Sequence, residues 1–234
     1  MNYPRILLIS AAIFALIIPG IQAQQEVRYS HARVARNVIK KFKGIKTYTA
    51  GFRIQTKDGR RIRNMRGSFY YQKPGKVRFS FSQPSGNLIV SDGKTMWVYI
   101  RRLNAVGKQD LTLKKKNESG RPIFVGTPGP GLARLFRKYH YRFDSPEQPR
   151  VVDGAKVFVL DMEQREKIGG YENIKLFIDA SSYLVRKAVA SDGYGKTTTM
   201  TFIKPALDRQ LDGTRFQYKP GRGVRVVNNP LVNE

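Results

Sequence analysis

The sequence contains no cysteine and only two histidines among its 234 residues. Without thiols, the chain can form no disulfide bond, no thiolate metal site and no cysteine nucleophile. The two histidines, His31 and His140, also argue against a histidine-based metal site. We therefore predict neither a metal nor a cofactor. We expect the hydrophobic core alone to stabilise the fold, since a chain of this length can bury one.

Recognisable catalytic motifs are missing as well, including G-x-S-x-G, the P-loop, H-E-x-x-H and C-x-x-C. Residues 126–131 are rich in glycine but lack the Gly-Lys-Ser/Thr that binds phosphate. Asp92 and Asp192 are candidates for acid–base chemistry, but each precedes a glycine, which is typical of a turn. Glu163 and Glu166 are interpreted as solvated. We predict that the protein is not an enzyme, with an unrecognised hydrolase as a minor alternative.

Acidic residues are scarce, because 17 Asp and Glu face 43 Lys and Arg, for a formal net charge of +26. The imbalance is greatest in residues 27–91, where sixteen basic residues accompany one acid, Asp58. Such a surface attracts polyanions such as nucleic acid, anionic lipid or acidic glycolipid. A solvated surface that only keeps the protein soluble explains the same composition.

No apolar run is long enough for a typical membrane span of about 20 residues. The longest, Ile6–Ile18, follows Arg5 and ends at Pro19-Gly20, which is typical of an export signal. We predict a signal peptide at residues 1–23, cleaved after Ala23, with an uncleaved anchor as the alternative. Export argues against nucleic acid as a partner, so an anionic membrane surface is the remaining candidate for the basic residues. The mature protein is predicted to be a single domain, residues 24–234.

Patterns of β-strands dominate the mature chain. Residues 74–99 predict three strands in series, and the chain is organised around them. Val77, Phe79 and Phe81 alternate with polar residues in the first, whereas the next two are apolar on both faces. A sheet that is apolar on both faces must be covered on both or must hold an apolar ligand.

Five Asp-Gly pairs mark turns along the chain and favour an antiparallel meander. Further strands are predicted at residues 47–54, 61–72, 141–144, 155–164, 171–178, 184–191, 197–203 and 215–218. Residues 101–121 are expected to form a loop, and the tail from Lys219 is expected to fray.

Two amphipathic helices are predicted, at Val27–Phe42 and at Gly131–Tyr139. Their apolar stripes contain Val34, Val38, Phe42, Leu132, Leu135 and Phe136. A helix over one face of the sheet could act as a lid, and an acyl chain would gain about 0.8 kcal/mol per buried CH₂ beneath it. Any single apolar residue, such as Phe79, is equally explained as ordinary core.

Residues 67–99 resemble the outer-membrane lipoprotein carrier family. The family pattern is a glycine, an aromatic strand, a basic residue before proline, a second aromatic strand, Gln-Pro, and Ile-Val-Ser-Asp-Gly-Lys before an aromatic strand that ends in tyrosine. Its counterparts here are Gly67, Lys73-Pro74, Gln83-Pro84, residues 89–94 and Tyr99. Thr127-Pro128 and the ending at residues 211–218 are similar too. The likeness covers most of the mature chain and is weak in residues 142–191.

The resemblance implies a mostly β fold of the α+β class, an incomplete antiparallel β-barrel with a helical lid over a hydrophobic cavity. It implies a monomeric periplasmic chaperone without a cofactor. Such a protein takes acylated lipoproteins from an inner-membrane lipoprotein-release complex to an outer-membrane acceptor. Members often have arginine before the proline as a latch for the lid. Lys73 is the latch candidate here, although lysine cannot form the same forked bonds.

We expect acyl chains to lie against eight residues: Phe69, Tyr71, Phe79, Phe81, Leu88, Val90, Trp97 and Tyr99. Two alternatives remain open. A binder of anionic lipid or glycolipid with the same fold would use the same surface, and so would a lipid-sensing or lipoprotein-sensing regulatory protein that delivers nothing.

Overall fold

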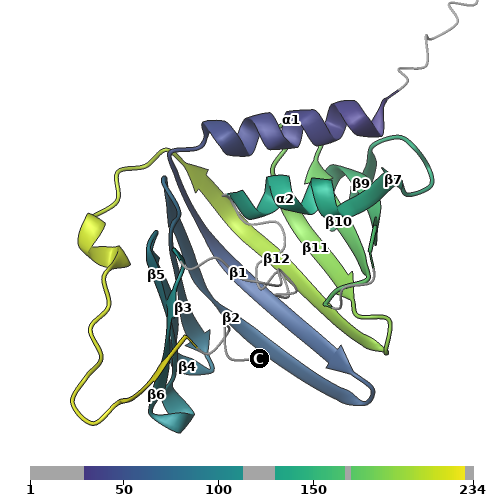
Figure 1. Ribbon diagram of the computed structural model, residues 1–234. Helices are drawn as coiled ribbons and strands as arrows, with labels where there is room; N and C mark the ends of the chain where they lie inside the picture. The colour runs from purple at the N-terminus through teal and green to yellow at the C-terminus, as the bar shows by residue number, and fades with distance from the viewer. Residues whose placement is uncertain (1–28, 113–129, 167–169, 230–234) are drawn as a thin grey trace, which may run out of the picture.

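The computed structural model describes residues 29–112, 130–166 and 170–229. Within these ranges, one 13-stranded sheet curls around two α-helices, α1 (His31–Gly44) and α2 (Pro130–Lys138) (Figure 1). The predicted fold class is confirmed in this form, an open, curled and almost entirely antiparallel sheet with two helices.

Neighbouring strands in the sheet follow the order β13-β6-β5-β4-β3-β2-β1-β12-β11-β10-β9-β7, and β8 pairs with β9. All pairs are antiparallel except β13 with β6. The strands are β1 (Thr47–Asp58), β2 (Arg61–Gln72), β3 (Lys76–Gln83), β4 (Ser85–Asp92), β5 (Thr95–Ile100), β6 (Ala105–Asp110), β7 (Tyr139–Phe143), β8 (Arg150–Val152), β9 (Ala155–Gln164), β10 (Asn173–Asp179), β11 (Val185–Ser191), β12 (Lys196–Leu207) and β13 (Arg225–Asn228).

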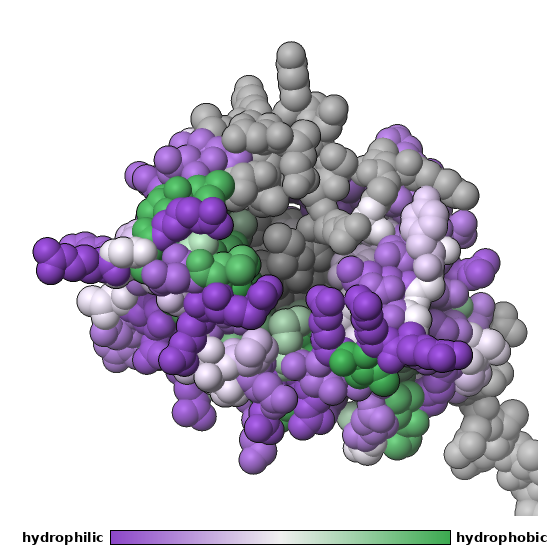
Figure 2. All heavy atoms as spheres, turned by 90° about the horizontal axis from the view of Figure 1, so that it is seen from below, coloured by the Kyte–Doolittle hydropathy of each residue, from purple (hydrophilic) through white to green (hydrophobic). Residues whose placement is uncertain are grey.

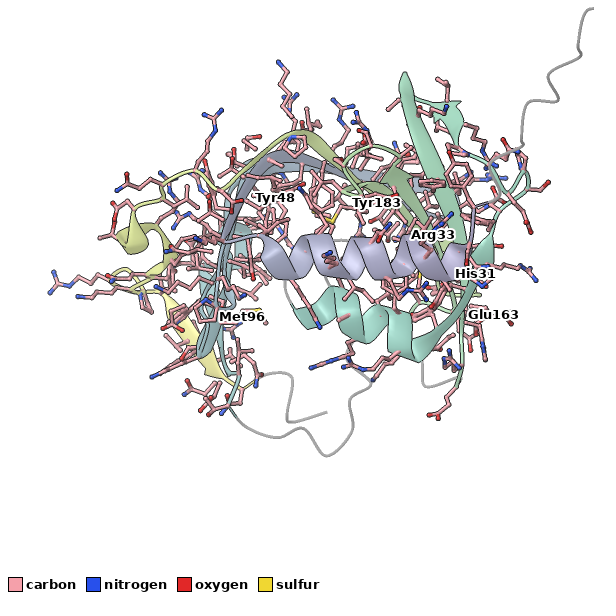
Figure 3. All side chains as sticks on the ribbon, turned by 90° about the horizontal axis from the view of Figure 1, so that it is seen from above. His31, Arg33, Tyr48, Met96, Glu163 and Tyr183 are labelled. Atoms are coloured by element: carbon pink, nitrogen blue, oxygen red, sulfur yellow. The ribbon has the colours of Figure 1, made fainter. Side chains whose placement is uncertain are left out.

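β1 lies at the centre of the sheet, between β2 and β12. Tyr48, Phe52 and Ile54 are buried on one side of this strand, whereas Arg53 and Gln55 are exposed on the other. Because strand side chains alternate, the sheet has an inner face towards the helices and an outer face away from them. Seen from above, the sheet forms an arc around α1 and α2 (Figure 3).

The two helices correspond to the two predicted amphipathic segments. Residues 27 and 28 of the predicted first helix lie outside the described residues. The structure starts α1 at His31 and continues it to Gly44, and α2 spans Pro130–Lys138. No helix in the described part of the chain is long and apolar enough to cross a membrane. The predicted signal peptide, residues 1–23, lies outside the described residues.

Three sequence predictions, one near the middle of the chain and two near its end, are wrong. Residues 101–112 form a short 3₁₀ helix, η1 (Arg101–Leu103), and strand β6 instead of a loop. Gly213–Phe216 forms a second 3₁₀ helix, η2, in place of a strand, because the Asp212 carboxylate accepts a hydrogen bond from the Thr214 N–H. The tail does not simply fray, since β13 pairs with β6. Short strands of this kind depend on a distant partner, which local periodicity cannot reveal.

The predicted turn carboxylates have the expected roles. Asp92 accepts hydrogen bonds of 2.8 Å from the N–H groups of Lys94 and Thr95. Asp192 accepts from the N–H groups of Tyr194 and Lys196 at 3.0 and 3.1 Å. Both side chains therefore hold turns. Glu163 and Glu166 are exposed, as expected.

Candidate functional site

The apolar stripes of α1 and α2 pack against the inner face of the sheet. The six predicted stripe residues are all buried, with at most 6% of each residue exposed: Val34, Val38, Phe42, Leu132, Leu135 and Phe136. All six belong to the same hydrophobic cluster as the inner-face residues of β1, β2 and β3. The helices therefore cover the inner face at one end of the arc.

An aromatic cluster lies at the centre of the inner face. The rings of Phe69 and Phe79, on neighbouring strands, have centroids 4.5 Å apart. Phe52 on β1 contacts Phe79 at 5.3 Å and Phe81 at 5.1 Å in edge-to-face geometry. Tyr48 extends the cluster to Phe69 at 5.8 Å. Edge-to-face pairs of this kind add to the stabilisation from burial alone.

Gly67 makes room for this cluster. It pairs with Phe52 on β1 and with Phe81 on β3. A Cβ atom at this position would lie 2.0 Å from the Ser80 carbonyl oxygen and 2.9 Å from the Phe52 ring. Because no side chain can occupy that space, glycine allows the Phe52 ring to lie across β2.

Beyond the aromatic cluster, the inner face continues as a partly exposed apolar surface. Phe81 and Ile89 are only partly buried against the core. Met96 and Val98 follow on β5 in the same register, also half-buried. Seen from the end opposite the helices, the molecule has a central hollow, and both hydrophilic and hydrophobic side chains of the described residues lie along its rim (Figure 2).

The inner surface offers apolar contact but little chemistry. The only buried polar side chains among the described residues are Ser91 and Gln109. Burial raises the pKa values of Tyr48 and Tyr71, so both phenols stay neutral across the physiological range. No group of three or more His, Asp or Glu residues in the described ranges could hold a metal ion. The surface is therefore suited to aliphatic chains and lacks paired acid and base groups.

The eight residues predicted to contact acyl chains divide between the two faces. Phe69, Tyr71, Phe79 and Phe81 belong to the inner face, and the first three of them are fully or almost fully buried. Ile89 is paired with Phe79 and with Val98, so these three side chains share the inner face. The other four predicted residues are their neighbours along β4 and β5 and therefore lie on the outer face. Those four residues are Leu88, Val90, Trp97 and Tyr99.

A β-bulge explains this division. Ser82 pairs with Ser85 next to the turn, and an uninterrupted ladder from that pair would place Leu88 opposite Phe79. The register shifts by one residue between Ser80 and Ser82, so that Ile89 lies opposite Phe79 instead. A one-residue shift moves every side chain of a strand to the other face.

The C-terminal segment covers the four outer-face residues. Phe216 of η2 is 1% exposed, and η2 contacts β3 and β4. The Tyr218 ring lies 6.4 Å from Trp97 and 6.3 Å from Tyr99, measured between ring centroids. The predicted two-sided apolarity of these strands thus reflects a second cluster on the outer face.

Arg78 fastens this segment to the outer face. Its guanidinium donates to the Arg215 carbonyl oxygen at 2.8 Å and to the Ser80 hydroxyl at 2.9 Å. The Arg215 guanidinium in turn lies 4.4 Å from the centre of the Tyr70 ring, a cation–π contact. Burial, followed by the charge of Arg215, lowers the pKa of Arg78. None of these residues was predicted from the sequence to have a role.

Lys73, the latch candidate, lies against the end of α1. Its ammonium group donates to the Lys43 carbonyl oxygen at 3.2 Å. Its backbone N–H donates to the Lys46 carbonyl oxygen at 2.8 Å. The turn between β2 and β3 is therefore tied to the last turn of α1 by a side-chain hydrogen bond and to the connection between α1 and β1 by a backbone hydrogen bond.

A separate cleft of about 490 Å³ lies between the last turns of α1 and the end of β12. Lys40, Lys41 and Asp208 line it together with Asn37 and Tyr183. Because this cleft lies outside the aromatic cluster, it does not extend the apolar inner surface.

Residues 43–219 match the family model described as outer membrane lipoprotein carrier protein LolA. An outer-membrane lipoprotein carrier protein of Legionella pneumophila is 27% identical over 188 residues, which are 80% of this chain and 86% of that protein. One from Azotobacter vinelandii is 26% identical and covers 97% of this chain and 99% of its own length. The crystal structure of an uncharacterized conserved protein from Thermus thermophilus superposes with a TM-score of 0.56 at 13% identity, covering 86% and 99% of the two chains, and this likeness concerns the fold alone.

Proposed function

The chain belongs to the outer membrane lipoprotein carrier family, and on that premise we propose that it binds the acyl chains of lipoproteins on the inner face of its sheet. The observation that carries this proposal is the aromatic cluster beneath α1 and α2, continued by a half-buried apolar surface. Carriers need apolar contact without chemistry. A surface without buried charge supplies it.

The helices offer a route for loading. Their apolar stripes occupy the part of the inner face that acyl chains would use, so cargo would replace one apolar partner by another. At about 0.8 kcal/mol per buried CH₂, a chain of about fifteen methylenes would gain about 12 kcal/mol. Against that gain stand the hydrogen bonds that hold the end of α1 and the burial of the stripe residues, at about 1.5–3 kcal/mol for each large side chain. Loading therefore requires the acyl chains to bury more apolar area than the helices give up. Lys73 is the residue that would close the lid again.

We place this carrier in the periplasm, moving lipoproteins from an inner-membrane release complex towards an outer-membrane acceptor, without catalysis. The family relationship supports this direction and these partners. A second function, in which the same surface binds anionic lipid or glycolipid, draws its support from the net charge of +26.

The test compares two matched variants with the unaltered protein. Phe81→Glu places a charge on the inner face, and Leu88→Glu places one on the outer face, at half-buried positions on neighbouring strands. Binding of a fluorescent triacylated peptide should be lost in the first variant and retained in the second. Trp97 lies on the outer face, so its fluorescence is not a suitable probe for cargo.

Mass spectrometry of the protein purified from periplasm separates the two functions. Co-purified lipoprotein supports the carrier, whereas phospholipid or glycolipid alone supports the second function. Retained peptide binding in folded Phe81→Glu would overturn the inner-face assignment for either function.

A further inference from the structure

Two turns lie side by side at the end of the molecule opposite α1 (Figure 1). They join β1 to β2 and β11 to β12, and they are adjacent because Asp58 pairs with Lys196. A large apolar side chain is exposed beside the first turn, on β2, and another within the second turn. Ile62 is 58% exposed and Tyr194 is 91% exposed. Neither contributes to the core, so packing does not explain why these positions are apolar.

Cations surround these two apolar residues. Lys57, Arg60, Arg61 and Arg63 belong to the first turn and its strands, and all four are exposed. Lys196, the half-buried first residue of β12, follows the second turn. The carboxylate of Asp192 accepts hydrogen bonds inside its own turn and is thus committed locally.

A second site of the same composition lies at the same end, across the hollow. The connection from β5 to β6 passes through η1, at the lower left of Figure 1. Ile100 is 40% exposed and Leu103 is 48% exposed, and between them lie the exposed cations Arg101 and Arg102. Four of the eight exposed large hydrophobic residues of the described chain therefore gather at this end.

We propose that this end is a docking surface for bilayers that contain anionic phospholipid. The tip surface consists of Ile62, Tyr194, Ile100 and Leu103 with Lys57, Arg60, Arg61, Arg63, Lys196, Arg101 and Arg102. Seven cations face three carboxylates here, those of Asp58, Asp192 and Glu172, so the charge complements an anionic membrane. Tyrosine is enriched at membrane interfaces, where its ring sits at the level of the head groups.

This combination distinguishes docking from solubility. A surface that only solubilises would gain from cations but would be weakened by exposed isoleucine, leucine and tyrosine. Peripheral binding instead uses both together, because shallow apolar insertion adds to electrostatic attraction. Docking by the tip surface would turn the hollow of Figure 2 towards the bilayer and α1 away from it. The inference goes beyond the proposed function, since it requires no bound cargo.

Co-sedimentation with vesicles of phosphatidylcholine, with and without phosphatidylglycerol, tests the charge. The unaltered protein should bind only the anionic vesicles and dissociate at high salt. The double variant Arg60→Gln/Arg63→Gln should weaken binding about fivefold per cation removed. Arg36→Gln/Lys40→Gln on α1 removes the same net charge away from the tip surface and should have a much smaller effect. An equal loss in both variants would overturn the proposal.

The absence of cysteine allows a direct test of insertion. An environment-sensitive dye on Tyr194→Cys or Leu103→Cys should shift to the blue with anionic vesicles. The control is Val151→Cys on β8, where the native side chain is 73% exposed but lies outside the tip surface. A shift at position 151 as large as at 194, or none at 194, would contradict the assignment. Phe81→Glu should still bind vesicles, which separates this result from failure of the carrier function.

Discussion

The Lys73 ammonium group donates a hydrogen bond of 3.2 Å to the Lys43 carbonyl oxygen and so joins the turn after β2 to the last turn of α1. The last carbonyl groups of a helix lack partners within the helix and carry partial negative charge. A lysine satisfies one of them here. The bond is single and exposed.

We predict that Lys73→Ala loosens the end of α1 without unfolding the sheet. The loss should be about 0.5–1.5 kcal/mol, the range for one ordinary hydrogen bond. Hydrogen exchange should therefore accelerate at the backbone amides of the last turn of α1. Lys57→Ala, an exposed lysine far from the helix, is the control. Unchanged exchange in Lys73→Ala would show that the side chain holds nothing.

Gly67→Ala is expected to destabilise the protein strongly. The new Cβ would lie 2.0 Å from a backbone oxygen, and backbone cannot yield as a flexible side chain can. Overpacking of this kind costs about 1–3 kcal/mol or more. Urea unfolding measures the loss. Gly44→Ala is the matched control, because nothing lies within 4 Å of its Cβ position, and its stability should stay within about 0.5 kcal/mol of the original.

Phe216→Ala should release the C-terminal segment from the outer face. The side chain is 1% exposed, so its removal is expected to cost about 3–5 kcal/mol. Because Tyr218 packs near Trp97, the tryptophan emission should shift to the red as water reaches it. Gln217→Ala, an exposed neighbour, should change neither stability nor emission.

Asp179 makes the stability of the fold depend on pH in the acidic range. Burial alone would raise its pKa, but hydrogen bonds from Ser181 and Ser182 outweigh burial and hold the pKa well below its usual range. A depressed carboxyl pKa stabilises the fold in full above the unfolded value of about 3.9, and this contribution is lost progressively as the pH falls from there through the lower folded pKa.

Asp179→Asn should therefore lower stability at pH 7 by about 1.5–3 kcal/mol, the range for hydrogen bonds to a charged group. The difference should begin to shrink as the pH falls below about 4 and should be smaller at pH 3 than at pH 7. Urea midpoints measured between these two pH values provide the comparison. A difference that stays constant with pH would mean that the carboxylate charge is not responsible.

Local patterns in the sequence predict much of this fold. Apolar and polar residues alternate with a period of 2 in β1, and the apolar stripes of both helices have a period of 3.6 residues. Each pattern can be recognised within its own segment, without knowledge of the strand or helix that packs against it. The inner-face residues Tyr48 and Phe52 belong to that visible alternation, although the sequence analysis did not assign them to the site.

The side of the sheet on which Leu88 and Val90 lie could not be predicted from such a local pattern. Their side depends on one extra residue in β4, between Ser85 and Leu88, and such a bulge leaves no periodic mark on the sequence. Likewise, the short β6 and β13 stabilise each other across more than a hundred residues. Their apolar content is too low for either to be recognised alone.

The pairing of β1 with β12 has a consequence for the assembly of the molecule. Thr56 and Thr198, which face each other across these strands, are 142 residues apart in the chain. During synthesis, one long edge of β1 stays bare until β12 has been made. Such an edge is a template for pairing with other chains. In a chain truncated before residue 196, the edge of β1 would stay unpaired, and the chain should aggregate. Strand β12 therefore also protects β1 from pairing with other chains.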